Sequence, residues 1–162
     1  MSVNPALRTP SDLSASATTT AVAALNPLVA DAIALWLKTK NYHWHVSGPN
    51  FRDLHLLLDD QATEILASVD PLAERVRKLG GRTITSIGHV TQLQSVTDSD
   101  AAFVSPQDML LDLVEENKRM AAALRKAHAV CDEQGDVGSA SIIEDFIDQA
   151  EERTWFLFEA SR

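Results

Sequence analysis

The chain has 162 residues, enough for one domain with a substantial core, and its 45% hydrophobic and 23% charged residues exclude an intrinsically disordered protein. Its net charge of −9 disfavours nucleic acid and anionic membranes as partners and favours cations. The single cysteine, Cys131, excludes an intrachain disulfide and favours a reducing compartment. The N-terminus shows no signal pattern and we expect no apolar run long enough to span a bilayer, so we predict a cytoplasmic protein without membrane contact.

The first 49 residues contain a predicted tail, a first helix and the signal that ends it. Residues 1–20 are rich in Ser, Thr, Ala and Pro and lack apolar periodicity, so we predict a flexible tail followed by one domain over residues 21–162. Apolar residues then recur at helical spacing from about Ala21, and Asn26-Pro27 has the composition of a cap and first turn. Ser47-Gly48-Pro49 should end this helix.

The remaining chain predicts three more long helices. Asn50 should cap a helix that runs to Gly80-Gly81, with a kink at Pro71. Residues 82–104 form a long crossover with room for a short helix. Two further helices are predicted over residues 105–133 and 137–160, separated by Gln134-Gly135-Asp136. We therefore predict an all-α protein: a ferritin-like four-helix bundle whose long crossover, between helices two and three, carries a short helix.

Two pairs of potential metal ligands lie on the second predicted helix. His55 and Asp59 are four residues apart, as are Asp70 and Glu74, so each pair projects from one side of the helix. Asp70 follows Asp59 by eleven positions. A step of eleven positions along a helix returns to nearly the same face, but it advances about 16 Å along the axis. Because metal–ligand bonds are about 2 Å long, one ion cannot bind both pairs of the same chain.

A second copy of the chain resolves this separation. In an antiparallel two-fold dimer, His55 and Asp59 of one chain would face Asp70 and Glu74 of the other, which makes two equal sites. His43 lies five helical turns after Leu25 on the apolar stripe and could complete the nitrogen ligands, whereas His45 points away. Two imidazoles and up to three carboxylates suit iron(II), manganese or zinc.

Ordinary structural roles are the alternative for each of these residues. A histidine on an apolar stripe is more often a hydrogen-bonded core residue than a ligand. Acidic pairs on a helix usually face solvent, and Glu74 could form an ion pair with Lys78. The metal site is favoured because five such residues share compatible faces.

The same residues belong to a longer pattern. It comprises H-W-x-V-x-G-x-x-F-x-x-L-H-x-x-x-D at residues 43–59, then D-x-x-A-E-R at residues 70–75 and L-G-G at residues 79–81. This pattern resembles the Dps mini-ferritins, the DNA-binding proteins of starved cells, and the resemblance extends from about Ala21 to Ala160.

The resemblance implies a function and a ligand set. It implies a ferroxidase centre to which one chain gives His43, His55 and Asp59, and its mate gives Asp70 and Glu74. It also implies a homododecameric shell, built on two-fold dimers, that oxidises iron(II) with hydrogen peroxide in preference to oxygen and stores ferric mineral. Such a protein would protect against oxidative damage, and zinc or manganese could substitute for iron.

Further residues gain expected roles from the same resemblance. Trp44 and Trp155 match the aromatic residues that flank such centres, with core packing as the alternative. Asp132, Glu133 and Asp136 cluster where the family places acidic three-fold pores for iron entry, with a solvated turn as the alternative.

DNA binding receives little support from this chain. The predicted tail contains a single basic residue, Arg8, and no lysine precedes Lys38, so we expect DNA binding to be weak or absent. The alternative from a different class is a nucleoid-associated, DNA-compacting protein whose metal site is incidental. A ferritin with a diiron site inside one bundle is disfavoured because no glutamate is followed three residues later by histidine.

Overall fold

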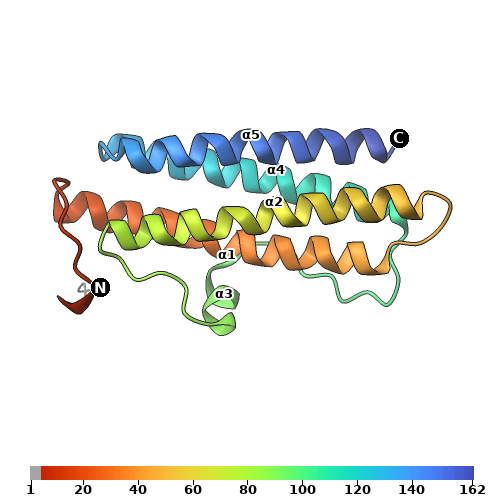
Figure 1. The fold of residues 1–162 in the computed structure, drawn as a ribbon, viewed down its shortest axis with the longest axis horizontal. Coiled ribbons are helices and arrows are strands. Elements are labelled where there is room, and N and C mark those ends of the chain that lie inside the picture. Colours follow the sequence, from red (N-terminus) through yellow and green to blue (C-terminus); the bar gives the residue numbers. More distant parts are fainter. Residues whose placement is uncertain (1–4) are drawn as a thin grey trace.

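A computed structural model describes residues 5–162, and these residues contain helices and no strand. A short 3-10 helix, η1 (Pro5–Leu7), precedes four long helices and one short one: α1 (Ala15–His45), α2 (Phe51–Lys78), α3 (Ile87–Leu93), α4 (Pro106–Glu133) and α5 (Val137–Ala160). The long helices form two hairpins, α1 with α2 and α4 with α5, that pack together as a bundle (Figure 1). The predicted four-helix bundle with a short helix in the crossover is confirmed.

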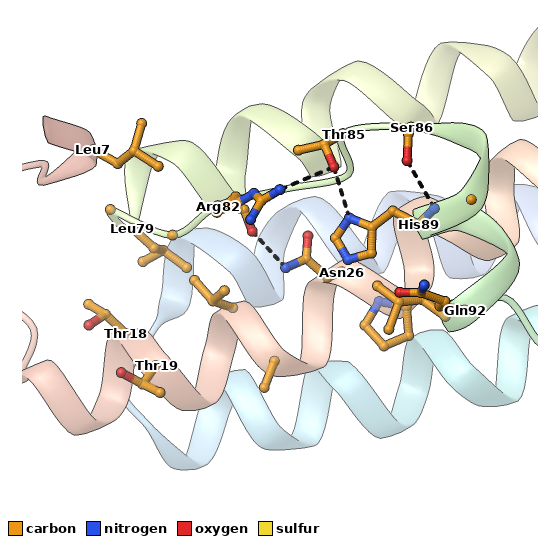
Figure 2. Close-up of a pocket in the computed structure, with 17 residues that line it drawn as sticks. Leu7, Thr18, Thr19, Asn26, Leu79, Arg82, Thr85, Ser86, His89 and Gln92 are labelled. Carbon is orange, nitrogen blue, oxygen red and sulfur yellow. Dashed lines mark hydrogen bonds between the residues drawn. The ribbon is translucent and has the colours of Figure 1, made fainter. Parts of the chain in front are cut away.

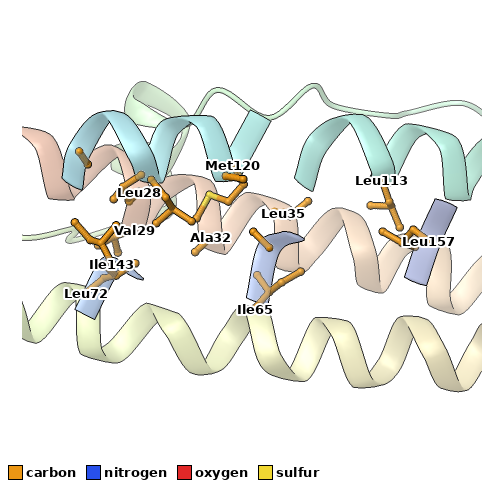
Figure 3. Packing of buried hydrophobic residues seen from close by; sticks show 14 of the residues in the cluster. Leu28, Val29, Ala32, Leu35, Ile65, Leu72, Leu113, Met120, Ile143 and Leu157 are labelled. Atoms are coloured by element: carbon orange, nitrogen blue, oxygen red, sulfur yellow. The ribbon is translucent and has the colours of Figure 1, made fainter. Parts of the chain in front are cut away.

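The core runs along the centre of the bundle and is almost entirely aliphatic. Leu35, Leu72, Leu113, Ile143 and Leu157 are completely buried and come from all four long helices (Figure 3). Each such side chain contributes about 1.5–3 kcal/mol through removal from water. The core therefore fixes which face of each helix remains at the surface.

Local sequence signals explain most helix ends. Ser105 caps α4, because its hydroxyl accepts a hydrogen bond from the backbone N–H of Asp108, and Pro106 occupies the first turn. Gly80 has φ +79°, a conformation that suits glycine, just past the end of α2. Asn50 occupies the position before α2, but its side chain makes no cap hydrogen bond, so that detail of the prediction was wrong.

The first helix begins earlier than predicted. Ser14 caps α1 by accepting from the N–H of Ala17, and Ala17 is buried, so residues 15–20 belong to the helix and not to a tail. Pro27 lies inside α1 and not in its first turn, because burial outweighs local helix propensity. Residues 1–4 of the predicted tail lie outside the described residues.

The expectation that the chain contains no membrane-length apolar run was also wrong. By length and composition α1 could cross a membrane. In the bundle, however, Leu25, Leu28 and Leu35 of α1 are buried against the other helices, and the core helix of a soluble protein has the same length and composition. Its apolar character is therefore explained by packing.

Buried charged groups hold the crossover against the bundle. The Nζ of Lys38 donates to the carbonyl of Thr97 at 2.8 Å and to Glu116 at 3.0 Å, and it lies 2.8 Å from Asp112. Thr97 in turn donates its N–H to Glu116 at 3.0 Å. These bonds tie Thr97 of the crossover to α1 and α4.

Candidate metal centre

Two histidines from the α1–α2 hairpin form a reciprocal pair. The rings of His43 and His55 stack with centroids 3.8 Å apart and planes at 22°. The Nδ1 of His43 lies 2.8 Å from the carbonyl oxygen of His55, and the Nδ1 of His55 lies 2.9 Å from the carbonyl oxygen of His43. Because a carbonyl only accepts, each Nδ1 carries a proton, and in the neutral imidazole the lone pair is therefore on Nε2. This is the usual way in which metal-binding histidines are oriented.

A charged carboxylate lies beside this pair. Asp59 Oδ1 lies 3.9 Å from the Nε2 of His43 and accepts a hydrogen bond from the Nζ of Lys40 at 2.7 Å. The bond from Lys40 is the main cause that lowers the pKa of Asp59. Asp59 therefore lies near His43, and His55 stacks against the His43 ring.

Lys40 is a residue that the sequence reasoning missed. It precedes His43 by three residues, so it lies on nearly the same side of α1, and its spacing from both His43 and Trp44 could have pointed to it. Its ammonium group lies 2.7 Å from Oδ1 of Asp59 and neutralises that carboxylate.

Asp70 and Glu74 lie apart from the histidine pair, on the exposed face of α2. Glu74 pairs with Lys78 at 3.3 Å, so the ion pair considered as an alternative is present in the single chain. Within residues 5–162, no group of three or more metal-ligating side chains meets the geometry of a complete site. One chain thus presents two separate half-sites.

Apolar side chains surround these half-sites without being buried. Leu56 and Leu66 on α2 are 42% and 46% exposed, and they alternate with Asp59 and Asp70 at spacings of three and four residues. Leu37 on α1 is 52% exposed. Exposed leucines on one helix face are typical of a surface that another protein covers. These leucines lie outside the apolar stripe that forms the core, and this position on the helix could have been recognised in the sequence as a sign of a covered surface.

Both flanking tryptophans are at the surface. Trp44 is 56% exposed and Trp155 is 60% exposed. The alternative that either ring packs in the core of its own chain is therefore wrong. The Nζ of Lys40 lies 5.9 Å from the Trp44 ring centroid, which places Trp44 next to the cation that contacts Asp59. Trp155 contacts Phe156 on α5, with ring centroids 5.1 Å apart.

The three residues of the predicted pore have different surroundings. Asp132 and Glu133 are exposed at the end of α4. Asp136 is buried, accepts from the N–H of Ser139 as the cap of α5, and forms an ion pair with Arg75. Its charge is therefore neutralised within the chain, which corrects its assignment as a pore anion.

Comparisons with known proteins agree with this fold and pattern. A ferritin-like domain model matches residues 22–160. The chain is 33% identical to the DNA protection during starvation protein of Agrobacterium fabrum, over 93% of each chain, and 35% identical to a low temperature-induced protein of Nostoc sp., over 82% of this chain and 75% of the relative. The structure of DpsC from Streptomyces coelicolor superposes with a TM-score of 0.91 at 30% identity, covering 94% of this chain and 90% of that one. The chain therefore belongs to the ferritin-like proteins and, among them, to the Dps mini-ferritins.

Proposed function

We propose that this protein is a cytoplasmic ferroxidase and iron-storage mini-ferritin. It oxidises iron(II), preferably with hydrogen peroxide, at sites shared by two-fold-related chains, and it stores ferric mineral inside a homododecameric shell. The observation that carries the proposal is the reciprocal histidine pair, which leaves two Nε2 lone pairs beside the ionised Asp59.

The two-fold arrangement follows from the positions of the half-sites. Asp59 and Asp70 share a face of α2 but are separated by about 16 Å along the helix. Antiparallel contact between two copies of α2 brings Asp59 of one copy near Asp70 of the other. The same contact buries Leu56 and Leu66, which are exposed in the single chain.

The donor set fits the proposed reaction. Neutral imidazoles bind iron(II), and carboxylates stabilise the higher charge of iron(III) after oxidation. Two iron(II) ions supply one electron each to one peroxide molecule, its O–O bond breaks, and two protons complete two water molecules. Iron is the substrate in this scheme, and zinc or manganese would compete for the same donors.

Protection of DNA, which the name of the Agrobacterium relative describes, would come from the removal of iron and peroxide. Strong DNA binding is disfavoured because each chain carries −9 and a shell would multiply that charge by its number of chains. A gel-shift assay at about 150 mM salt tests the alternative of a DNA-compacting protein. Retarded DNA without iron oxidation would favour that alternative.

The direct test of the proposal is anaerobic addition of iron(II) followed by peroxide, read as ferric absorbance. We expect His43→Ala and Asp59→Ala to lose the fast oxidation seen in the wild type. His45→Ala is the matched control, because His45 is exposed and binds the carbonyl of Asn41 at 2.7 Å, away from the pair. Equal rates in all four proteins would refute the site. Sedimentation of the same samples tests the shell.

A further inference from the structure

His55 is the less confined member of the histidine pair. His43 is 7% exposed, whereas His55 is half-buried on the surface of α2. One hydrogen bond, from its Nδ1 to the carbonyl of His43, orients the His55 ring. The second side-chain torsion of a histidine has broad preferences, so further contacts are needed to hold the ring in one orientation. The proposed function assigns no role to the residue of α2 that supplies such a contact.

That residue is Phe51, one turn before His55 on the same helix. The two are four residues apart on α2, a spacing at which side chains of a helix touch, and their ring centroids lie 5.0 Å apart with planes at 32°. His55 therefore contacts two rings, that of His43 on α1 and that of Phe51 on α2. Aromatic contacts at this distance favour particular ring orientations, so Phe51 adds a constraint that the hydrogen bond alone does not give.

The turn before α2 places Phe51. Phe51 is the first residue of the helix, and its backbone N–H donates to the carbonyl of Gly48 at 3.0 Å, which closes the turn. Gly48 has φ +103°, which strains any other residue, although a Cβ at this position would meet no neighbour within 4 Å. The glycine is thus required by backbone conformation and not by space. Val46 and Leu54, both buried, fix the two sides of the turn.

The register of α1 against α2 is fixed at both ends of this hairpin. At the end away from the histidines, the Nδ2 of Asn26 on α1 donates to the carbonyl of Arg82, in the loop after α2, at 3.0 Å (Figure 2). At the other end, the reciprocal bonds join His43 to His55. Neither helix can shift along the other without breaking one of these bonds, so the three rings keep the same neighbours.

We propose that Phe51 is a positioning residue for metal binding. Its ring holds the imidazole of His55 in the orientation set by the hydrogen bond to His43, so that Nε2 is in place before a metal ion arrives. This inference rests on the proposed function, since it concerns one of the proposed ligands. It gives Gly48 and Phe51 of the sequence pattern one joint role. Phe51 need not be accessible for that role, because the ring it holds belongs to its own chain.

Zinc titration of the full-length, metal-free protein by calorimetry tests the proposal, because zinc binds such donors without redox chemistry. Phe51→Leu keeps apolar bulk but removes the ring, and it should weaken zinc binding about threefold to tenfold, the effect expected for one aromatic contact. Phe51→Tyr keeps the ring and should bind zinc as the wild type does. Phe158→Leu on α5 is the matched control, because Phe158 is 47% exposed and Phe51 is 45% exposed, and it should leave the affinity unchanged.

The kinetics of iron(II) oxidation by peroxide separate positioning from a general loss of structure. A poorly oriented ligand weakens iron(II) binding but leaves the bound state reactive. Phe51→Leu should therefore raise the KM for iron(II) about threefold to tenfold and leave kcat unchanged. A lower kcat with an unchanged KM would overturn the proposal. Sedimentation checks each variant, and an altered assembly of Phe51→Leu would make Phe51 an interface residue and would also overturn the proposal.

Two comparisons distinguish failure of this inference from failure of the proposed function. Unchanged zinc affinity in Phe51→Leu, beside a wild type whose affinity falls in His55→Ala, would overturn the role of Phe51 alone. A Phe51→Tyr variant as weak as Phe51→Leu would do the same, because the ring would not be the cause. Equal zinc affinities in the wild type and His55→Ala would instead refute the metal site, and this inference with it.

Discussion

Mixing two inactive variants would show whether each site is built from two chains. Asp59→Ala removes a ligand from the half-site that contains the histidines, and Glu74→Ala removes one from the other half-site. Either variant alone breaks both sites of its own two-fold dimer. In a mixed dimer, one site collects both substitutions, while the other receives a native Asp59 from one chain and a native Glu74 from its mate.

The expected recovery can be calculated from this geometry. When equal amounts of the two variants are dissociated and reassembled at random, half of the dimers are mixed and half of the sites in those dimers are intact. The mixture should therefore recover about one quarter of the wild-type rate of iron(II) oxidation by peroxide. Ferric absorbance measured per chain gives this rate, and each variant reassembled with itself provides the baseline.

Two results would contradict the shared site. If the five ligands acted within one chain, every chain in the mixture would carry a broken site, and the rate would stay at the baseline. If Glu74→Ala alone kept the wild-type rate, Glu74 would be no more than the partner of Lys78, to which it is paired at 3.3 Å. Asp60→Ala, which removes a neighbouring exposed carboxylate, is the matched control and should remain active.

Three further predictions concern groups near the site. Burial, with the hydrogen bond to Asp112, raises the pKa of Tyr42 to about 12, so the ultraviolet titration of this single tyrosine should have its midpoint there and not near 10. Because the folded-state pKa lies above the unfolded one, about 3 kcal/mol of stability should be present below pH 10 and lost by about pH 12, and Tyr42→Phe should lack this loss in denaturant titrations. Lys38→Met removes one partner of buried Glu116, which keeps its ion pair with Arg119, and should lower the free energy of unfolding by about 1–3 kcal/mol in urea. Lys40→Met should strengthen metal binding severalfold at neutral pH by removing a competing cation. Calorimetry with zinc at neutral pH measures this affinity. Equal zinc affinities in the variant and the wild type would contradict the role assigned to Lys40.

The sequence predicted the helices best where a local signal marks their ends. Ser105-Pro106 and Gly80 are such signals, and α2, α4 and α5 begin or end within about two residues of the prediction. It failed where tertiary packing decides. The Ser/Thr/Ala-rich start of α1 has weak periodicity, yet Ala17 and Ala21 are buried, and Pro27 is accommodated inside the helix. Small residues in a close helix contact give little hydropathy signal.

In the candidate site, too, the features set by local spacing were predicted and those set by tertiary packing were not. Spacing alone placed His55 with Asp59 and showed that Asp70 lies too far along the helix for a common ion. The hydrogen bonds that orient the imidazoles could not be predicted, because each joins a ring to the backbone carbonyl of the residue twelve positions away, across the α1–α2 turn. The contact between Lys40 and Asp59 likewise depends on how the two helices are packed.

Under the proposed function, these unpredicted contacts would orient the ligands of the shared site before the chains meet. The backbone of each histidine accepts the Nδ1–H of the other, so neither ring has to change tautomer or rotate when metal arrives. Lys40 lowers the pKa of Asp59 in the meantime, and the exposed Glu74 forms an ordinary surface ion pair with Lys78. In the proposed site a metal ion would displace the partly buried ammonium group of Lys40 and the exposed one of Lys78. The leucines beside these groups supply the apolar surface for association, so the hydrophobic effect brings the chains together and the ligands need only be oriented.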